Sequence, residues 1–396
     1  MRRALLVLVL VTGAAPLALA QATPERPKDQ SPGTVAPGEI ERLRREIESE
    51  TRSNVELLLD AHTETGGLND KLRYLRFGAR LNLRRGSGST LRLTAIQAPY
   101  ATEGGIVEES ATSLSIGALG RHSEAIGYEW EIGAVRFSTG RWDGTGLLRL
   151  TVRASDALRY SVGVSRTLVE ESMLSAVGLD PVLGPFAGER VGAVTDNRLS
   201  ASVSWQLPLR LDLVGEGALG IHAGSNTGSN LFKRLGGGPF WNAVAKAPEE
   251  SISLLRIGAW FEYFGFDEDR LGYGGASLVD ARGQEVPLDE LGSDGISPEP
   301  DPPHPGVGGY FSPEHFTSLV GRVELRGRAS PELEYNVAAF LGRQSYTGVE
   351  SRGAGGIAAS LKLRLGDRVS LPLSYVWDDY GPFTQQTLRA RVVWLF

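Results

Sequence analysis

The sequence predicts an all-β fold, a transmembrane antiparallel β-barrel of about 16 strands with a short N-terminal helical leader. Three observations support this prediction. Apolar and polar residues alternate along many short segments, the connections between these segments alternate between short and long, and the final segment ends on an aromatic residue. We divide the chain into a signal peptide (1–20), a flexible leader with a short periplasmic helix (21–52) and an outer-membrane barrel (53–396).

The first residues have the pattern of a cleaved secretory signal. Arg2 and Arg3 precede an apolar stretch from Leu5 to Val11, and Ala18-Leu19-Ala20 forms a small-x-small cleavage site. The apolar stretch is short for a spanning helix, so we prefer cleavage to a retained N-terminal anchor. Cleavage leaves 39 Lys+Arg against 47 Asp+Glu, a net charge of −8. This acidic balance argues against a nucleic-acid partner.

Composition narrows the fold further. The chain has no cysteine, so it has no disulfide framework, no thiolate metal site and no cysteine for a lipid anchor. After the signal there is no run of 18 apolar residues, which excludes helical membrane spans. Many short alternating runs and 50 glycines remain, as in barrels whose strands carry only one apolar face.

The leader contains one helical pattern. Residues 21–38 are rich in polar residues and proline, and Glu39–Thr51 follows with Ile40, Leu43 and Ile47 on one face. We expect a short periplasmic helix that is either solvated or docked.

From Ser53 onward the apolar period is two, which is typical of strands. The strands of a soluble β-sandwich also alternate between apolar and polar residues. The lengths of the connections therefore distinguish a membrane barrel from a sandwich. The clearest alternating runs lie at 55–61, 75–83, 148–154, 158–164, 199–205, 357–365, 369–377 and 388–396.

The connections alternate in length, as they do in barrels with short periplasmic turns and long outer loops. Short connections are predicted at 84–89, 156–157, 207–208, 328–331 and 366–367, and long ones at 99–109, 168–197, 224–250 and 279–313. An even strand count then requires a strand between Phe264 and Val279, which we place at Arg270–Leu278. Both ends of the barrel lie on the periplasmic side, and the acidic run Asp267–Asp269 falls on a periplasmic turn.

The last strand carries an assembly signal. Val392, Trp394 and Phe396 are spaced by two and end the chain, which resembles the signal by which barrel-assembly machinery recognises its clients. Barrel-assembly machinery and outer-membrane lipids are therefore expected partners.

Gly308-Gly309-Tyr310-Phe311-Ser312-Pro313 forms a distinctive segment at a predicted loop-to-strand junction, in which we interpret Gly308, Gly309, Ser312 and Pro313 as the structural motif. This segment looks like the GGYFSP-type segment of one known family, the C-terminal outer-membrane domain of the bacterial cellulose synthase operon protein C. Residues 165–181 and the stretch from Ile40 through Leu68 are also similar to the family. The resemblance implies a pore that exports cellulose or a related glucan, with the polysaccharide chain as its partner.

One departure from that family stands out. A long array of tetratricopeptide repeats precedes the barrel in the family, whereas here residues 21–52 precede the first strand, without a repeat of about 34 residues. We expect a separate periplasmic repeat protein or a synthase complex to supply that contact. Residues 279–307 look like an inserted, proline-rich outer loop.

No motif indicates catalysis. None of the five histidines lies in a nucleophile or zinc motif, and there is neither a GxSxG nor an HExxH pattern. The run Gly236–Pro239 lacks the lysine of a phosphate loop, so we interpret it as a flexible loop. We therefore expect no enzyme activity, no catalytic residue, no metal and no cofactor.

The substrate path is predicted from the alternation. If the apolar residues face lipid, arginines point inward, where they either brace the wall or contact sugars. Aromatic rings at the mouth could stack on sugar faces. The predicted path residues are Tyr310, Phe311, Trp142, Trp241, Arg76, Arg80, Arg149 and Arg153. A general diffusion porin and an exporter of an acidic polysaccharide remain alternatives, and no motif supports an outer-membrane enzyme.

Overall fold

The structure is a computed structural model of the whole chain. It describes residues 52–65, 72–86, 88–101, 108–171, 173–178, 189–248, 250–268, 277–279, 285–287, 310, 312–347, 349–380 and 383–396. The predicted signal peptide, flexible leader and periplasmic helix, like the inserted loop apart from two short strands, lie outside the described residues.

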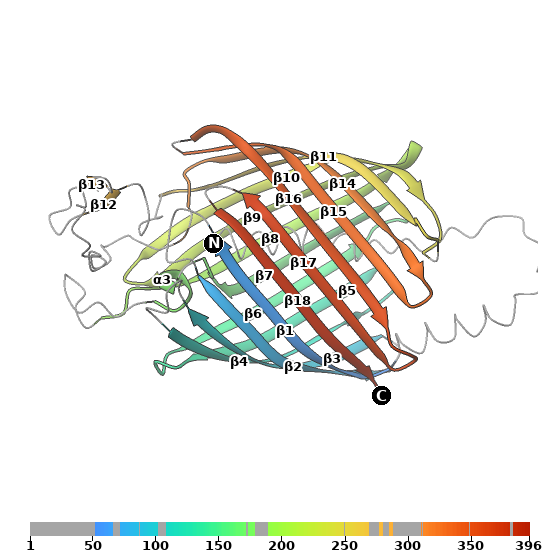
Figure 1. The fold of residues 1–396 in the computed structure, drawn as a ribbon, viewed down its shortest axis with the longest axis horizontal. Helices are drawn as coiled ribbons and strands as arrows, with labels where there is room; N and C mark the ends of the chain where they lie inside the picture. The colour runs from blue at the N-terminus through green and yellow to red at the C-terminus, as the bar shows by residue number, and fades with distance from the viewer. Residues whose placement is uncertain are drawn as a thin grey trace, which may run out of the picture.

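Sixteen strands of the described chain form a closed antiparallel barrel in which each strand pairs with its two neighbours (Figure 1). The first strand, β1, pairs with the last, β18, so the predicted closure is confirmed. The barrel strands are β1 (Asn54–Thr65), β2 (Arg73–Arg85), β3 (Ser89–Ala101), β4 (Glu108–Arg121), β5 (Ile126–Phe137), β6 (Trp142–Arg153), β7 (Leu158–Leu168), β8 (Gly192–Leu207), β9 (Leu211–Ser225), β10 (Gly228–Ala245), β11 (Leu254–Phe266), β14 (Phe316–Ser330), β15 (Leu333–Tyr346), β16 (Val349–Arg364), β17 (Val369–Tyr380) and β18 (Phe383–Leu395).

The period-two pattern sorts side chains between the outside and the lumen. On β6, Leu148 and Leu150 are about half exposed on the outer face, while Arg149 between them reaches Glu129 across the inner face. Successive side chains of a strand point to opposite faces, so each strand offers lipid an apolar row and the lumen a polar one. Among the described residues, no helix has the length and apolar character needed to cross a bilayer.

The two ends of the barrel differ in their connections. The short helix α3 (Met173–Ala176) and the strand pair β12 (Ser277–Val279) and β13 (Glu285–Pro287) lie at one end, and the C-terminus lies at the other (Figure 1). The turns at the C-terminal end are short, and one is the 3-10 turn η1 (Pro208–Arg210). By the usual arrangement of outer-membrane barrels, the short-turn end faces the periplasm.

The predicted outer loop at 224–250 is wrong, because residues 228–245 form β10. This strand contains the run Gly236–Pro239, so the flexible-loop interpretation of that run is wrong as well. Glycine and proline normally interrupt strands. Here a Cβ on Gly238 would collide with the backbone of Ala259 on β11, so glycine permits the close approach of the two strands.

The predicted barrel strand at Arg270–Leu278 is also wrong. The only part of that range that the structure describes, Ser277 and Leu278, belongs to β12, which pairs with β13 outside the barrel. The prediction omitted one barrel strand, β10, and added one that does not exist in the barrel, so the two errors leave the strand count unchanged. The predicted total of about 16 strands is confirmed. The error also misplaced Asp267, which lies just after β11 at the long-loop end rather than on a periplasmic turn, with its backbone N–H donating to Leu231 O at 3.1 Å.

Candidate functional site

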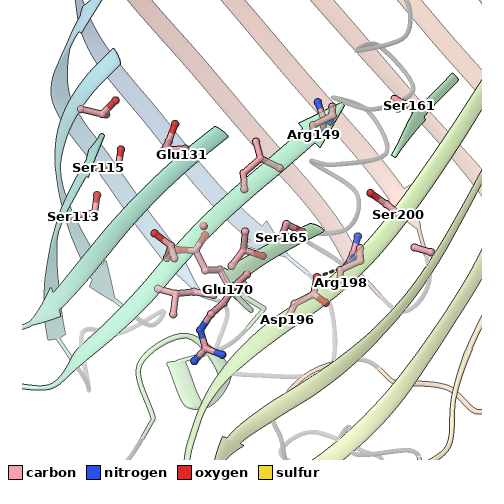
Figure 2. Close-up of a pocket in the computed structure, with 18 of the residues that line it drawn as sticks. Ser113, Ser115, Glu131, Arg149, Ser161, Ser165, Glu170, Asp196, Arg198 and Ser200 are labelled. Atoms are coloured by element: carbon pink, nitrogen blue, oxygen red, sulfur yellow. Dashed lines mark hydrogen bonds and ion pairs between the residues drawn. The ribbon is translucent and has the colours of Figure 1, made fainter. Parts of the chain in front are cut away.

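The barrel encloses a cavity of about 560 Å³. The inner faces of β2 to β10, with Arg389 of β18, line it. Figure 2 shows its polar lining, with serines of β4, β7 and β8 pointing into the space and charged side chains interspersed. This cavity is the candidate site, because polar groups from many strands converge on it.

Two parts of the cavity lining carry short hydroxyl side chains, one on β4 and one on β7 and β8. We define the serine wall as Ser113, Ser115, Ser161, Ser165, Ser200, Ser202 and Ser204. The hydroxyls of Ser161 and Ser202 lie 2.8 Å apart across the β7–β8 ladder, and Ser200 Oγ donates to Gly163 O at 3.4 Å. Five of these serines lie on the neighbouring strands β7 and β8. Ser113 and Ser115 lie on β4, two strands away, beyond Glu131 of β5 and Arg149 of β6.

The predicted arginines surround the serine wall and point into the lumen. Nη1 of Arg80 lies 3.7 Å from Glu56 Oε2, and Nη1 of Arg149 lies 3.6 Å from Glu129 Oε2. Arg76 forms an ion pair with Glu170. Arg153 Nη2 contacts Asp156 Oδ1 at 2.7 Å at the short-turn end. Most of these groups thus brace the wall, one of the two roles that the sequence left open.

The connection between β7 and β8 folds back into the barrel. Besides its ion pair with Arg76, Glu170 accepts a hydrogen bond from Tyr100 Oη at 2.6 Å. Beyond it, Ala176 and Val177 are buried against an apolar cluster on the inner faces of β2 to β5. The described part of this loop therefore packs against the inner faces of these strands. The cluster comprises Leu72, Tyr74, Ala98, Tyr100, Ala111, Val135, Phe137, Leu168, Ala176 and Val177.

Tyr310, Ser312 and Pro313, which precede β14, are also buried. Tyr310 is only 1% exposed and packs with an aromatic cluster on β10, β11, β14 and β15. Its ring centroid lies 5.1 Å from that of His222, whose Nε2 is 3.2 Å from Asp196 Oδ1. Asp196 in turn forms an ion pair with Arg198, drawn as a dashed line in Figure 2. Tyr310 therefore packs in the structure as the anchor of the segment before β14.

The two predicted tryptophans point away from the lumen. Trp142 is 60% exposed and shares the outward parity of Leu148 on β6. Trp241 is 52% exposed, on the same outer face of β10 as Leu235. Their period-two position puts both rings at the barrel exterior, in keeping with the aromatic girdles of such barrels, and this removes them from the path that we propose.

Of the remaining predicted site residues, the structure describes some and not others. Gly308, Gly309 and Phe311 lie outside the described residues. Ser312 and Pro313 are buried, and Pro313 O accepts a hydrogen bond from Phe266 N at 3.0 Å, which ties this segment to β11. Val392, Trp394 and Phe396 form an exposed outward row, and their role in assembly stays a prediction.

Sequence reasoning missed Glu170, Asp196 and His222. The first lies in the stretch that resembled the cellulose synthase family, and this likeness was the available signal. The serine wall was visible as the alternation of Ser200, Ser202 and Ser204, although no role was given to it. Within the described ranges, no group of three or more His, Asp or Glu side chains has the geometry of a metal site.

A closed barrel of 16 strands with an apolar exterior and a polar internal cavity is the architecture of outer-membrane transport proteins. Residues 70–275 match the family described as the cellulose synthase operon protein C C-terminus. The chain belongs to this family, and its place is the bacterial outer membrane.

Solved structures share the barrel. A bacterial polysaccharide outer membrane secretin is similar with a TM-score of 0.59 and 12% identity, over 87% of this chain and 99% of that one. CdiB from Acinetobacter baumannii has a TM-score of 0.42 and 10% identity, over 87% of this chain and 60% of that one. The CymD monoaromatic hydrocarbon channel has the same score and identity, over 87% and 88%. No curated protein sequence matches the chain.

Proposed function

We propose that the barrel exports an exopolysaccharide, cellulose or a related glucan, through its lumen and without catalysis. The serine wall carries this proposal. A glucan presents hydroxyls along its whole length, and serine hydroxyls can both donate to them and accept from them. Each such hydrogen bond is worth only about 0.5–1.5 kcal/mol net, so a chain can exchange partners and slide.

The cargo class has two further supports. The chain belongs to a family named for the cellulose synthase operon, and its fold is that of a protein described as a polysaccharide secretin. A passage for polymer also needs a polar lining, and serines of β4, β7 and β8 contribute to it beside charged side chains.

The export role implies further partners. The outward row of Val392, Trp394 and Phe396 suits recognition by barrel-assembly machinery and then contact with outer-membrane lipid. On the periplasmic side, a separate repeat protein or a synthase complex would deliver the polysaccharide chain.

The test is to obstruct the serine wall. In Ser200→Trp an indole replaces a hydroxymethyl group in the lumen, and we expect secreted glucan to fall at least tenfold. Leu199→Trp is the matched control, because Leu199 is the neighbouring residue, 50% exposed on the outer face. Both variants should still show the shift in gel mobility on heating that marks a folded barrel.

Two outcomes would contradict the proposal. Normal glucan secretion by Ser200→Trp at normal barrel yield would exclude this wall as the path. A general diffusion porin would instead be favoured if Ser200→Trp lost small-sugar permeation in liposomes while cells that carry it secreted glucan at the parent level.

A further inference from the structure

Two arginines face each other directly on the inner wall. Arg153 at the end of β6 pairs in register with Arg159 at the start of β7, so both side chains lie on the same face. Like charges placed opposite one another across an antiparallel ladder are destabilising. A pair that serves stability alone would be expected to carry opposite charges at these positions.

The surroundings of this pair are basic. Its acidic neighbour Asp156 contacts Arg153, but its side chain is 98% exposed on the turn, where water screens the charge. The three adjacent short turns, residues 84–90, 121–127 and 153–159, contain five arginines against two acidic residues. These turns belong to neighbouring hairpins, from β2–β3 to β6–β7, so the charge is concentrated on one side of the periplasmic mouth.

The excess of positive charge continues inside. The cavity is lined by eight arginines and four carboxylates, and Arg159 is one of the eight. Three of the other arginines, Arg80, Arg149 and Arg389, also contact carboxylates outside this lining, namely Glu56, Glu129 and Asp60. The inward parity of Arg153 and Arg159 points them to the lumen rather than to lipid headgroups. A local excess of one sign of charge, as in the pair Arg153 and Arg159 at the mouth, raises the local concentration of oppositely charged ligands.

From this arrangement we propose that the transported glucan carries anionic groups, carboxylates or acidic esters, and that Arg153 and Arg159 capture them at the periplasmic entrance. Guanidinium groups bind such groups in a bidentate manner, and two adjacent ones hold one anion. Further into the lumen from these arginines, the serine wall begins at Ser161 and Ser204, and its hydroxyls bind the sugar rings. This inference rests on the export function proposed above.

The experiment compares two soluble probes on the whole barrel in a planar bilayer. A neutral cello-oligosaccharide and a carboxylated cello-oligosaccharide of the same length are added on the periplasmic side, and the block of single-channel current is measured. We expect the carboxylated probe to block at a concentration at least tenfold lower. The double variant Arg153→Gln with Arg159→Gln should abolish that difference, and Arg159→Lys should keep most of it.

The control variant is Arg210→Gln. Arg210 lies on the periplasmic turn η1, donates to Ala243 O at 3.4 Å and does not line the cavity. Its variant should behave like the parent. Inorganic phosphate at equal charge concentration should compete at least tenfold more weakly, because it lacks the sugar ring.

The outcomes separate the two proposals. Equal block by both probes overturns the inference and leaves glucan export standing. Equal competition by inorganic phosphate overturns it too, because the arginines would then bind any anion. Block by neither probe counts against the export function itself.

Discussion

Glu170 links the β7–β8 loop to the wall through two groups of different strands, Arg76 on β2 and Tyr100 on β3. Each is a hydrogen bond to a charged group, worth about 1.5–3 kcal/mol where it is shielded from water. Arg141 adds a further tie, since its Nη1 donates to Val177 O at 3.2 Å. Glu170 contacts groups on both β2 and β3, and Ala176 and Val177 pack against residues of the same two strands. We therefore expect the carboxylate of Glu170 to contribute to holding the described part of this loop inside the lumen.

Replacing the carboxylate tests this role. Glu170→Gln keeps the shape but loses the charge, and we expect the loop to leave the lumen part of the time. Single-channel conductance should rise and become noisier, while the heat stability of the barrel stays near that of the parent. Glu332→Gln, on an exposed short turn, is the control. A conductance trace identical to the parent's would show that the other contacts of the loop are enough to hold it.

Tyr310 anchors the segment before β14. Truncating a buried aromatic side chain costs about 3–5 kcal/mol, so Tyr310→Ala should release this segment and alter conductance for all solutes alike. Tyr310→Phe should remain close to the parent, because the hydroxyl has a long 3.3 Å contact with Asn230 Nδ2. The check is paired conductance and glucan secretion. Reduced glucan export with unchanged ion conductance in the alanine variant would instead indicate contact with the polymer.

At the scale of elements, local patterns predicted local features. Alternation identified β2, β7, β8, β16 and β17, because the burial of one face leaves a direct mark on the sequence. It failed on β10, where the run Gly236–Pro239 has no side-chain pattern. Glycine occurs in this strand because β10 packs closely against β11, and this packing depends on the register of the two strands. The sequence alone does not show that register. The pairing of Arg76 with Glu170 was hidden for the same reason, since their approach depends on the inward fold of a loop.

This account of β10 predicts a packing effect. Gly238→Ala should destabilise the barrel by about 1–3 kcal/mol, the usual cost of overpacking, because its methyl would meet the backbone of Ala259. We expect the folded barrel of this variant to convert to the unfolded gel band at a lower temperature than the parent, and we expect a lower yield of folded protein. Gly353→Ala is the matched control, because a Cβ there meets nothing within 4 Å. If the two variants melt alike, close strand approach is not the reason for glycine at this position.

At the scale of the whole molecule, closure is the property on which the rest depends. In hydrocarbon each unpaired backbone group costs several kcal/mol, so β1 and β18 cannot be left as free edges. The alternation of short and long connections and the terminal Phe396 predicted the closure. The sequence could not predict the register, which matches Leu57 to Val392 and Ala61 to Leu388. The register fixes which inward groups face one another across the seam, including Asp60 and Arg389, whose Oδ1 and Nε lie 3.4 Å apart.

The register can be tested with cysteines, since the chain has none of its own. Leu57 and Val392 lie opposite each other on the outer face, so Leu57→Cys with Val392→Cys should oxidise to a disulfide that joins the ends of the barrel. The boiled, oxidised protein then runs in a gel as a circle, at a different position from the linear chain, and reduction restores the parent position. Leu57→Cys with Leu388→Cys is the control, because Leu388 is four residues away along β18. That offset is about 14 Å, beyond the 7 Å between Cα atoms that a disulfide can bridge. Equal cross-linking of both pairs, or of the control alone, would show that the strands pair in another register or that the seam opens.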